Sequence, residues 1–307
     1  MSHNQQRRFI TLVLDTIQTL YTEEAEEAEP RITAQIGHLQ RILQRPGLKV
    51  AEILRTDILV GGILTEPCMT VLLRLASAPN VHPAAAELFH LILRAIPSKD
   101  IDTRTSMRRT LLMDAAMMNT PLPLIRALLE RGADPNATNG EGETPVMFAA
   151  EQGHSHTLEA LIEYGGDIHR RDHHERTALH HAASANRRDT VRLLLDHGAE
   201  IDLQNENGAT PLIDAARWPG QHDTVQYLLN QGAEPHLQNK TGANVWNLAN
   251  ENTLDILAPH FPNRELNQNQ AGGRTPRLLL RKTHHRKTKS HRRRATIRRS
   301  KTHRRRR

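Results

Sequence analysis

The feature of this sequence that most constrains its fold is a spacing of ten residues that recurs five times. In each copy an acidic residue stands ten positions before a residue that opens a helical pattern, in the pairs Asp100/Thr110, Asp134/Thr144, Asp167/Thr177, Glu200/Thr210 and Glu234/Asn244. The second members advance by 34, 33, 33 and 34 residues. A period near 33 indicates one supersecondary unit copied along the chain, so the sequence predicts a stacked repeat array.

One unit, residues 144–176, shows how such a copy can form helices. Thr144 can cap a helix with its hydroxyl, and Pro145 suits the first helical position, where no N–H is needed. Gly153 and Gly165 suit the turn between helices and the helix end. Apolar side chains recur between them at helical spacing, as Leu158, Leu161 and Ile162. Each unit is therefore predicted to be two short helices followed by a polar loop.

Two sets of segments recur in this register, and both resemble the ankyrin repeat. The helix-opening motif of that family resembles TPVMFAA (144–150), TALHHAA (177–183) and TPLIDAA (210–216). Its helix end and finger loop resemble ERGADPN (130–136), DHGAEID (196–202) and NQGAEPH (230–236). The resemblance covers residues 110–261 and implies an all-α ankyrin-repeat solenoid of helix-turn-helix units with short finger loops. Within it, residues 244–261 are expected to form a C-terminal cap.

The resemblance also makes predictions about single residues. It implies that a histidine at the fourth motif position hydrogen-bonds one finger loop to the next, and here only His180 fits that position. Asn186 replaces the glycine of the turn between helices, and asparagine is well suited to left-handed backbone. Trp246 stands where other copies have leucine, so we expect it to be buried under the cap.

The rest of the chain divides into four segments. Residues 70–109 resemble a divergent ankyrin copy, with a second helix expected over 88–96. Residues 1–69 are apolar at helical spacing over 7–21, 32–44 and 50–64, with a charged break before Pro30. They are predicted to form an N-terminal helical cap, the alternative being a separate adaptor module. Residues 262–273 suit a flexible linker, and residues 274–307 suit a disordered basic tail.

Charge separates the array from the tail. Residues 274–307 hold 17 of the 41 Lys and Arg residues and none of the 34 acidic residues, so residues 1–273 carry a formal charge of −10 within a total of +7. A tail of this kind suits a polyanion, because neutralising phosphates releases counterions. The tail contains no Tyr, Trp or Phe for base stacking. Its candidate nucleic-acid or nuclear-import residues are Arg292, Arg293, Arg294, Arg304, Arg305, Arg306 and Arg307.

Other interpretations of the tail stay open. It could bind an anionic membrane surface, or it could be a solvated segment with no single partner. Residues 293–297 resemble a substrate site of basophilic kinases, which makes Thr296 a candidate phosphorylation site. A phosphate there would add about two negative charges and weaken polyanion binding.

The residues argue against a catalytic or metal site. The single cysteine, Cys68, has no identifiable base near it in sequence, and no phosphate-binding glycine loop is present. His174-Glu175 begins a zinc-protease motif, but Ala178 stands where its second histidine belongs. The sequence therefore predicts no enzyme, no metal and no cofactor. It contains no apolar run long enough to span a membrane. We expect a monomeric intracellular protein of the nucleus or cytoplasm.

Binding is the function that remains. The resemblance implies a protein partner of unknown identity on the finger loops and the exposed side of the first helices. These loops are acidic over 135–143, basic over 168–176 and acidic over 201–209, and such differences select partners. Trp218 lies in an inserted turn, where it could anchor a partner or pack over the next unit. The candidate contact residues are Asn136, Asn139, Glu141, Arg170, Arg171, His173, His174, Asp202, Asn205, Trp218 and Lys240.

Three functions are compatible with these features. The first is a non-catalytic interaction scaffold whose basic tail serves nuclear targeting or nucleic-acid contact. The second is a nucleic-acid-associated protein that acts mainly through its tail. The third is a viral or bacterial adaptor that recruits host proteins, since ankyrin repeats ending in such a tail resemble products of large DNA viruses or intracellular bacteria.

Overall fold

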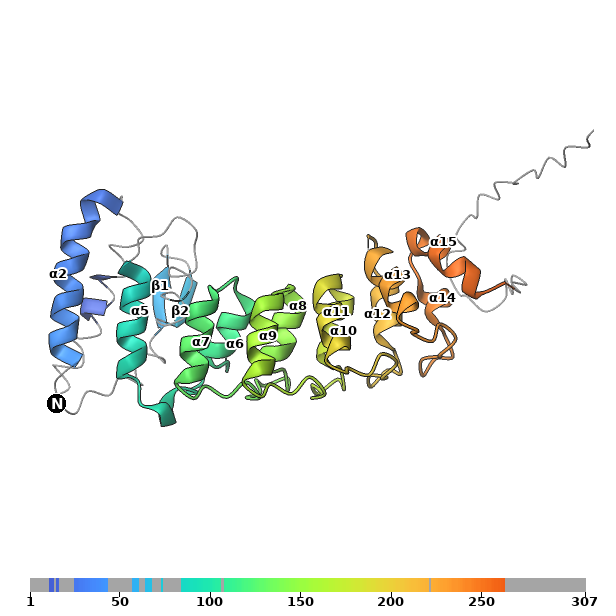
Figure 1. Cartoon of the computed structure of the whole chain (residues 1–307), viewed down its shortest axis with the longest axis horizontal. Coiled ribbons are helices and arrows are strands. Elements are labelled where there is room, and N and C mark those ends of the chain that lie inside the picture. Colours follow the sequence, from blue (N-terminus) through green and yellow to red (C-terminus); the bar gives the residue numbers. More distant parts are fainter. Residues whose placement is uncertain are drawn as a thin grey trace, which may run out of the picture. The chain divides into compact units, whose positions relative to one another are not determined.

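The computed structural model describes residues 11–13, 15–16, 25–43, 57–60, 64–67, 73, 84–105, 108–220 and 222–262. Four helix pairs follow one another in chain order through the repeat region (Figure 1). They are α6 (Leu111–Met117) with α7 (Leu122–Glu130), α8 (Pro145–Gln152) with α9 (Ser155–Glu163), α10 (Ala178–Ser184) with α11 (Arg188–Asp196), and α12 (Pro211–Ala216) with α13 (His222–Asn230). The first helices contact one another in succession, and so do the second helices. The repeat solenoid predicted from the period is confirmed.

The predicted helix starts are confirmed by their caps. Thr110, Thr144 and Thr210 each accept a hydrogen bond at 3.3 Å from the backbone N–H three residues later. Asn244 does the same through its side-chain oxygen, also at 3.3 Å, at the start of α14 (Val245–Leu248). These bonds satisfy donors that the first helical turn leaves unpaired. The predicted left-handed turn at Asn186 is confirmed by its φ of 58°.

Small and branched apolar side chains form the core between the two helix layers. The Ala-Ala pairs of the first helices are fully buried, which allows those helices to lie close together; they are Ala115, Ala116, Ala149, Ala150, Ala182, Ala183, Ala215 and Ala216. Leu158, Leu161 and Leu194 of the second helices are also buried. Burying one such leucine contributes about 1.5–3 kcal/mol. The core therefore grows by one layer with each unit.

The C-terminal unit is shorter than the others. After α14, a 3-10 turn (Glu251–Thr253) leads into α15 (Leu254–Leu257), which contacts α13. Trp246 is half-buried and lies 5.5 Å from the Phe261 ring, measured between centroids. The side chain of Trp246 is thus only partly covered, where burial under the cap was expected.

The N-terminal region corrects two predictions. Helix α2 (Ala25–Leu43) runs through Pro30, so the expected break there was wrong. Pro30 is the sixth residue of α2, so the helix continues past it with the loss of one backbone N–H donor. The helix expected over 50–64 was also wrong, because β1 (Asp57–Val60) and β2 (Leu64–Pro67) pair antiparallel. Gly61 and Gly62, between runs containing β-branched residues, are a hairpin signal that outweighed the helical spacing.

Helix α5 (Ala84–Ala95) connects the N-terminal region to the repeats. It confirms the helix expected over 88–96 and begins four residues earlier. It contacts both α2 and α7. Phe89 of α5 and Ile32 and Leu39 of α2 are fully buried. These contacts make α2 part of the same apolar core as the repeats.

Candidate functional site

The loops between units end in five short hairpins, which we call tips 1 to 5. Tips 2 to 5 span residues 139–143, 172–176, 205–209 and 239–243, and the described part of tip 1 consists of Thr105 and residues 108–109. In each tip the first residue donates its backbone N–H to the carbonyl oxygen of the fifth, at 2.8–3.0 Å. Each tip stands directly before the cap residue of the next first helix. The constant ten-residue spacing therefore positions one exposed tip per unit.

The first residue of tips 2 to 5 holds its loop together through its side chain. Asn139, Asp172, Asn205 and Asn239 each accept two backbone N–H bonds through one side-chain oxygen, from the residues two and four positions later, at 2.8–3.0 Å. Side chains of this kind favour such local turns. The tips are thus fixed by their own residues.

Backbone hydrogen bonds also join neighbouring tips. His173 donates its N–H to the Glu141 carbonyl at 2.9 Å, and Glu206 donates to the His174 carbonyl at 3.0 Å. Lys240 donates to the Asn207 carbonyl at 2.9 Å. Tips 2 to 5 therefore form one hydrogen-bonded strip. Tip 1 is linked to the next loop by the Arg104 guanidinium, which donates to the Thr138 carbonyl.

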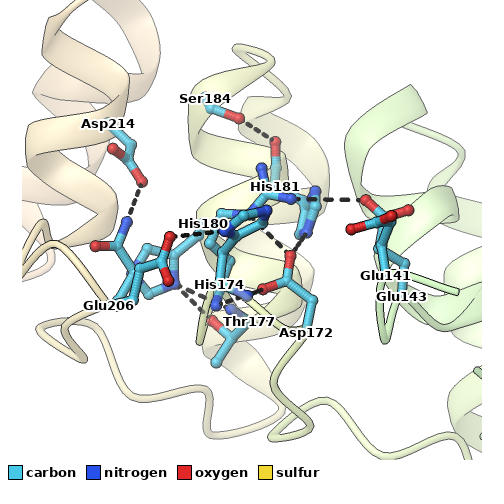
Figure 2. Close-up of polar contacts among 12 residues, drawn as sticks. Glu141, Glu143, Asp172, His174, Thr177, His180, His181, Ser184, Glu206 and Asp214 are labelled. Atoms are coloured by element: carbon cyan, nitrogen blue, oxygen red, sulfur yellow. Dashed lines mark hydrogen bonds and ion pairs between the residues drawn. The ribbon is translucent and has the colours of Figure 1, made fainter.

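Tip 3 differs from its neighbours because its first residue is a buried carboxylate. The side chain of Asp172 is 0% exposed. Besides its two backbone bonds, it accepts from Arg176 Nε at 2.8 Å and contacts His181 Nε2 at 3.1 Å. Figure 2 shows the Asp172 carboxylate beside the His181 ring, with Glu143 coming from the neighbouring unit. Burial raises the pKa of Asp172, but the His181 and Arg176 hydrogen bonds and charge outweigh burial and hold that pKa well below its usual range.

The same group of residues has the composition of a metal site. Glu143, Asp172 and His181 bring their ligand atoms within 4.8 Å of one another. The Arg176 guanidinium, however, lies against both carboxylates, with Nη2 at 3.6 Å from Glu143 Oε1. This guanidinium offsets one of the two carboxylate charges and occupies space beside both groups. The arrangement is therefore an ion-pair network that fixes the base of tip 3.

His180 performs the bridging role that the resemblance implied. Its Nδ1 accepts from the Thr177 backbone N–H at 3.2 Å, and its Nε2 donates to the Ala209 carbonyl of tip 4, also at 3.2 Å. Burial lowers the pKa of His180 to about 4. The ring is therefore neutral at pH 7, and this tautomer satisfies both nitrogens.

Asp214 occupies in the next unit the position that His181 holds in tip 3's unit. Asn205 Nδ2 donates to its carboxylate at 3.3 Å. Burial raises the pKa of Asp214 to about 6, against the opposing influence of Arg217 and Arg176. In one unit the carboxylate belongs to the tip, as Asp172, and its partner His181 to the helix. In the next unit the tip residue is Asn205 and the carboxylate of Asp214 belongs to the helix.

The candidate contact residues fall into three groups by exposure. Seven side chains are exposed: Glu141, Arg170, Arg171, His173, His174, Trp218 and Lys240. Trp218 is 58% exposed in the turn between α12 and α13, as predicted. Three are partly buried, namely Asn136, Asn139 and Asp202, and Asn205 is buried. The tail candidates Arg292–Arg294, Arg304–Arg307 and Thr296, and also Cys68, lie outside the described residues.

The less exposed candidates hold the loops together. Asn136 donates to the Gly165 carbonyl and accepts from the Asp167 N–H, both at 2.8 Å. Asp202 accepts from the Glu234 N–H at 3.0 Å. With Asn139 and Asn205 inside their tips, the side chains available for an external contact are the exposed ones. Their role as contacts stays a prediction.

Charge alternates along the tips. Tip 1 exposes Arg108, and Arg104 precedes it; the sequence interpretation missed both. Tip 2 exposes Glu141, and tip 3 is flanked by the exposed Arg170 and Arg171. Tip 4 carries Glu206, whose Oε1 lies 2.6 Å from His174 Nδ1. The ten-residue register could have revealed tip 1, because Asp100 places Arg108 at the fourth tip position.

The fourth position of every tip has left-handed backbone. Tips 2, 4 and 5 have glycine there, with φ between 75° and 79°. Tips 1 and 3 have Arg108 at 60° and Glu175 at 56°. A side chain in this conformation costs roughly 1 kcal/mol or more. Tips 1 and 3 therefore carry side chains where glycine would be easier to accommodate.

Comparison with known protein families agrees with this architecture. A family model described as "Ankyrin repeats (3 copies)" matches residues 76–172, 112–205 and 167–239. These overlapping matches extend over more than half of the chain. No curated protein matches the chain. Among the described residues, no helix has the length and apolar character needed to cross a membrane.

Proposed function

Because the chain belongs to the ankyrin-repeat family, whose repeats are generally protein-interaction modules, we propose that its array is a scaffold that binds a protein partner through its tips. The observation that carries the proposal is the strip of tips 2 to 5. Its backbone is hydrogen-bonded from tip to tip, while its exposed side chains are charged and differ from unit to unit. A preorganised surface loses little conformational entropy on binding, and unlike charges discriminate among partners.

Trp218 extends the proposed surface beyond the tips. It follows the end of a first helix and exposes more than half of its side chain. Exposed tryptophans are among the residues that most often carry binding energy at interfaces. We place it at the edge of the partner contact.

Photo-crosslinking tests this proposal directly. A photoreactive amino acid is placed at Glu141, Arg170 or Lys240 on the tips, and at Glu159, Arg192 or Gln226 as matched exposed positions on the second helices. We expect crosslinks to one protein from the tip positions and none to it from the controls. Equal crosslinking from both sets refutes the tips as the contact surface.

The basic tail supports a second proposal. Its 17 Lys and Arg residues without a single acid favour contact with nucleic acid or an import receptor. Full-length protein, residues 1–273 and residues 262–307 are compared for nuclear import and for binding to DNA and RNA at several salt concentrations. We expect import and polyanion binding to be lost with residues 274–307. Unchanged location and polyanion binding in residues 1–273 refute the role of the tail.

A further inference from the structure

The alternation of charge along the tips defines the kind of partner that the array fits. This step rests on the proposed interaction function and adds the chemistry of the partner. We propose that tips 1 to 3 bind an extended protein segment carrying two acidic side chains, with a basic side chain midway between them. Arg108 and the Arg170–Arg171 pair receive the acidic side chains, and Glu141 receives the basic one.

The spacing of the units sets the spacing in the partner. Packed helices lie roughly 8–10 Å apart, so tips 1 and 3 are separated by roughly 16–20 Å. An extended chain advances about 3.3 Å per residue. The two acidic side chains should therefore stand about six residues apart, with the basic side chain about three residues from each.

Tip 3 already contains an internal substitute for the partner's carboxylate. Glu175 Oε2 lies 3.2 Å from Arg171 Nη1, and both side chains are exposed, by 59% and 41% respectively. The neighbouring Arg170 is also exposed. A partner carboxylate can thus engage Arg170 and displace Glu175 from Arg171. Glu175 also has left-handed backbone, at a position where tips 2, 4 and 5 have glycine, so its side chain stands there at a local conformational cost.

The base of tip 3 holds these arginines in place. The buried Asp172 fixes the loop through the N–H groups of His174 and Arg176, and through the Arg176 guanidinium. Arg170 and Arg171 immediately precede this anchor. The exposed arginine charges therefore stand next to a loop that its own hydrogen bonds hold in place.

The same pattern disfavours a nucleic acid on this surface. A continuous phosphate backbone running from tip 1 to tip 3 would pass Glu141, and beyond tip 3 it would meet Glu206. Like charges at those points cost binding energy, whereas a peptide can vary its charge at every residue.

The proposal is tested by fluorescence anisotropy with the full chain and synthetic peptides. The probe is a labelled 13-residue Gly/Ser peptide with Glu at positions 4 and 10 and Lys at position 7. The comparison peptides have the charges inverted (Lys, Glu, Lys) or the three charged residues made adjacent. A labelled single-stranded RNA serves as the third ligand. All titrations are repeated at two salt concentrations, because exposed charge pairs are screened by salt.

Three variants test whether the probe binds at the Arg170–Arg171 pair. Arg170→Glu with Arg171→Glu should weaken binding of the probe about tenfold or more, since attraction becomes repulsion at two positions. Arg188→Glu with Arg192→Glu on α11 changes the net charge equally and should leave affinity within about twofold. Glu175→Gly should tighten binding about threefold, because it removes the competing carboxylate. A gain of affinity cannot arise from misfolding.

Three results of these titrations would overturn the proposal. The probe could show no saturable binding up to about 1 mM, the inverted peptide could bind with equal affinity, or the two double variants could lose equal affinity. If Arg170→Glu with Arg171→Glu lowers the affinity for RNA and leaves the affinity for the probe unchanged, the surface is assigned to nucleic acid instead. If crosslinking from the tips succeeds while the probe fails, the interaction function stands and only the partner chemistry is wrong.

Discussion

Replacing Asp172 by asparagine separates the two tasks of this side chain. Asparagine holds the same position in tips 2, 4 and 5, so the two backbone bonds should survive. The oxygen that accepts from Arg176 Nε at 2.8 Å and contacts His181 Nε2 at 3.1 Å becomes an amide nitrogen. A hydrogen bond to a charged group contributes about 1.5–3 kcal/mol. Because the Arg176 side chain is 34% exposed and can turn to water, we expect a loss of about 2 kcal/mol.

Urea unfolding followed by circular dichroism measures this loss. At a slope near 2 kcal/mol per molar, the midpoint should fall by about 1 M. Asp167→Asn is the matched control, since it makes the same chemical change in an exposed residue whose oxygen accepts the His169 N–H at 2.8 Å. It should remain within about 0.5 kcal/mol of the unsubstituted protein.

The pH dependence of Asp172→Asn gives a second check. The pKa of Asp172 is lower in the folded than in the unfolded protein, where it is near 3.8. Its contribution is therefore fully present above that value and is lost as pH falls through the folded-state pKa. The difference between the two proteins should be constant from pH 7 to 5 and shrink below pH 4. A loss under 0.5 kcal/mol at pH 7, or one that does not shrink in acid, refutes the reasoning.

Three further predictions concern other parts of the array. Burial raises the pKa of Asp214 from 3.8 to about 6, so the ionised carboxylate destabilises the folded protein. Asp214→Asn should therefore stabilise the protein by about 1–3 kcal/mol at pH 7.5, and this gain should vanish towards pH 4. Calorimetry measures both effects. Gly208→Ala should lower the free energy of unfolding by about 2 kcal/mol or more, since its Cβ would lie 2.8 Å from the Lys240 backbone nitrogen; Gly232→Ala, with a similar positive φ and open space, should cost about 1 kcal/mol. Trp218→Ala should leave thermal stability nearly unchanged and weaken capture of the partner about tenfold or more in a surface-binding assay.

The features that the sequence predicted well are those encoded locally. A threonine or asparagine cap acts within three residues, and the turn at Asn186 depends on one backbone conformation. The Asp172–His181 contact was missed because it joins a loop residue to a helix residue nine positions away, and only the folded register brings them together. The hairpin at 57–67 was missed because apolar spacing in a short run does not distinguish a helix from a strand.

The bonds between tips have a direction. In each joint of tips 2 to 5, the third residue of one tip offers its carbonyl and the second residue of the next tip offers its N–H. Every such unit thus offers a carbonyl acceptor to the unit that follows it and an N–H donor to the unit that precedes it, as in a head-to-tail assembly. Duplication or loss of a whole unit would regenerate a complete joint, whereas a change of half a unit would leave a donor or an acceptor behind. A lineage carrying this gene could therefore lengthen or reorder its sequence of tip charges in single steps without inventing a new contact between units.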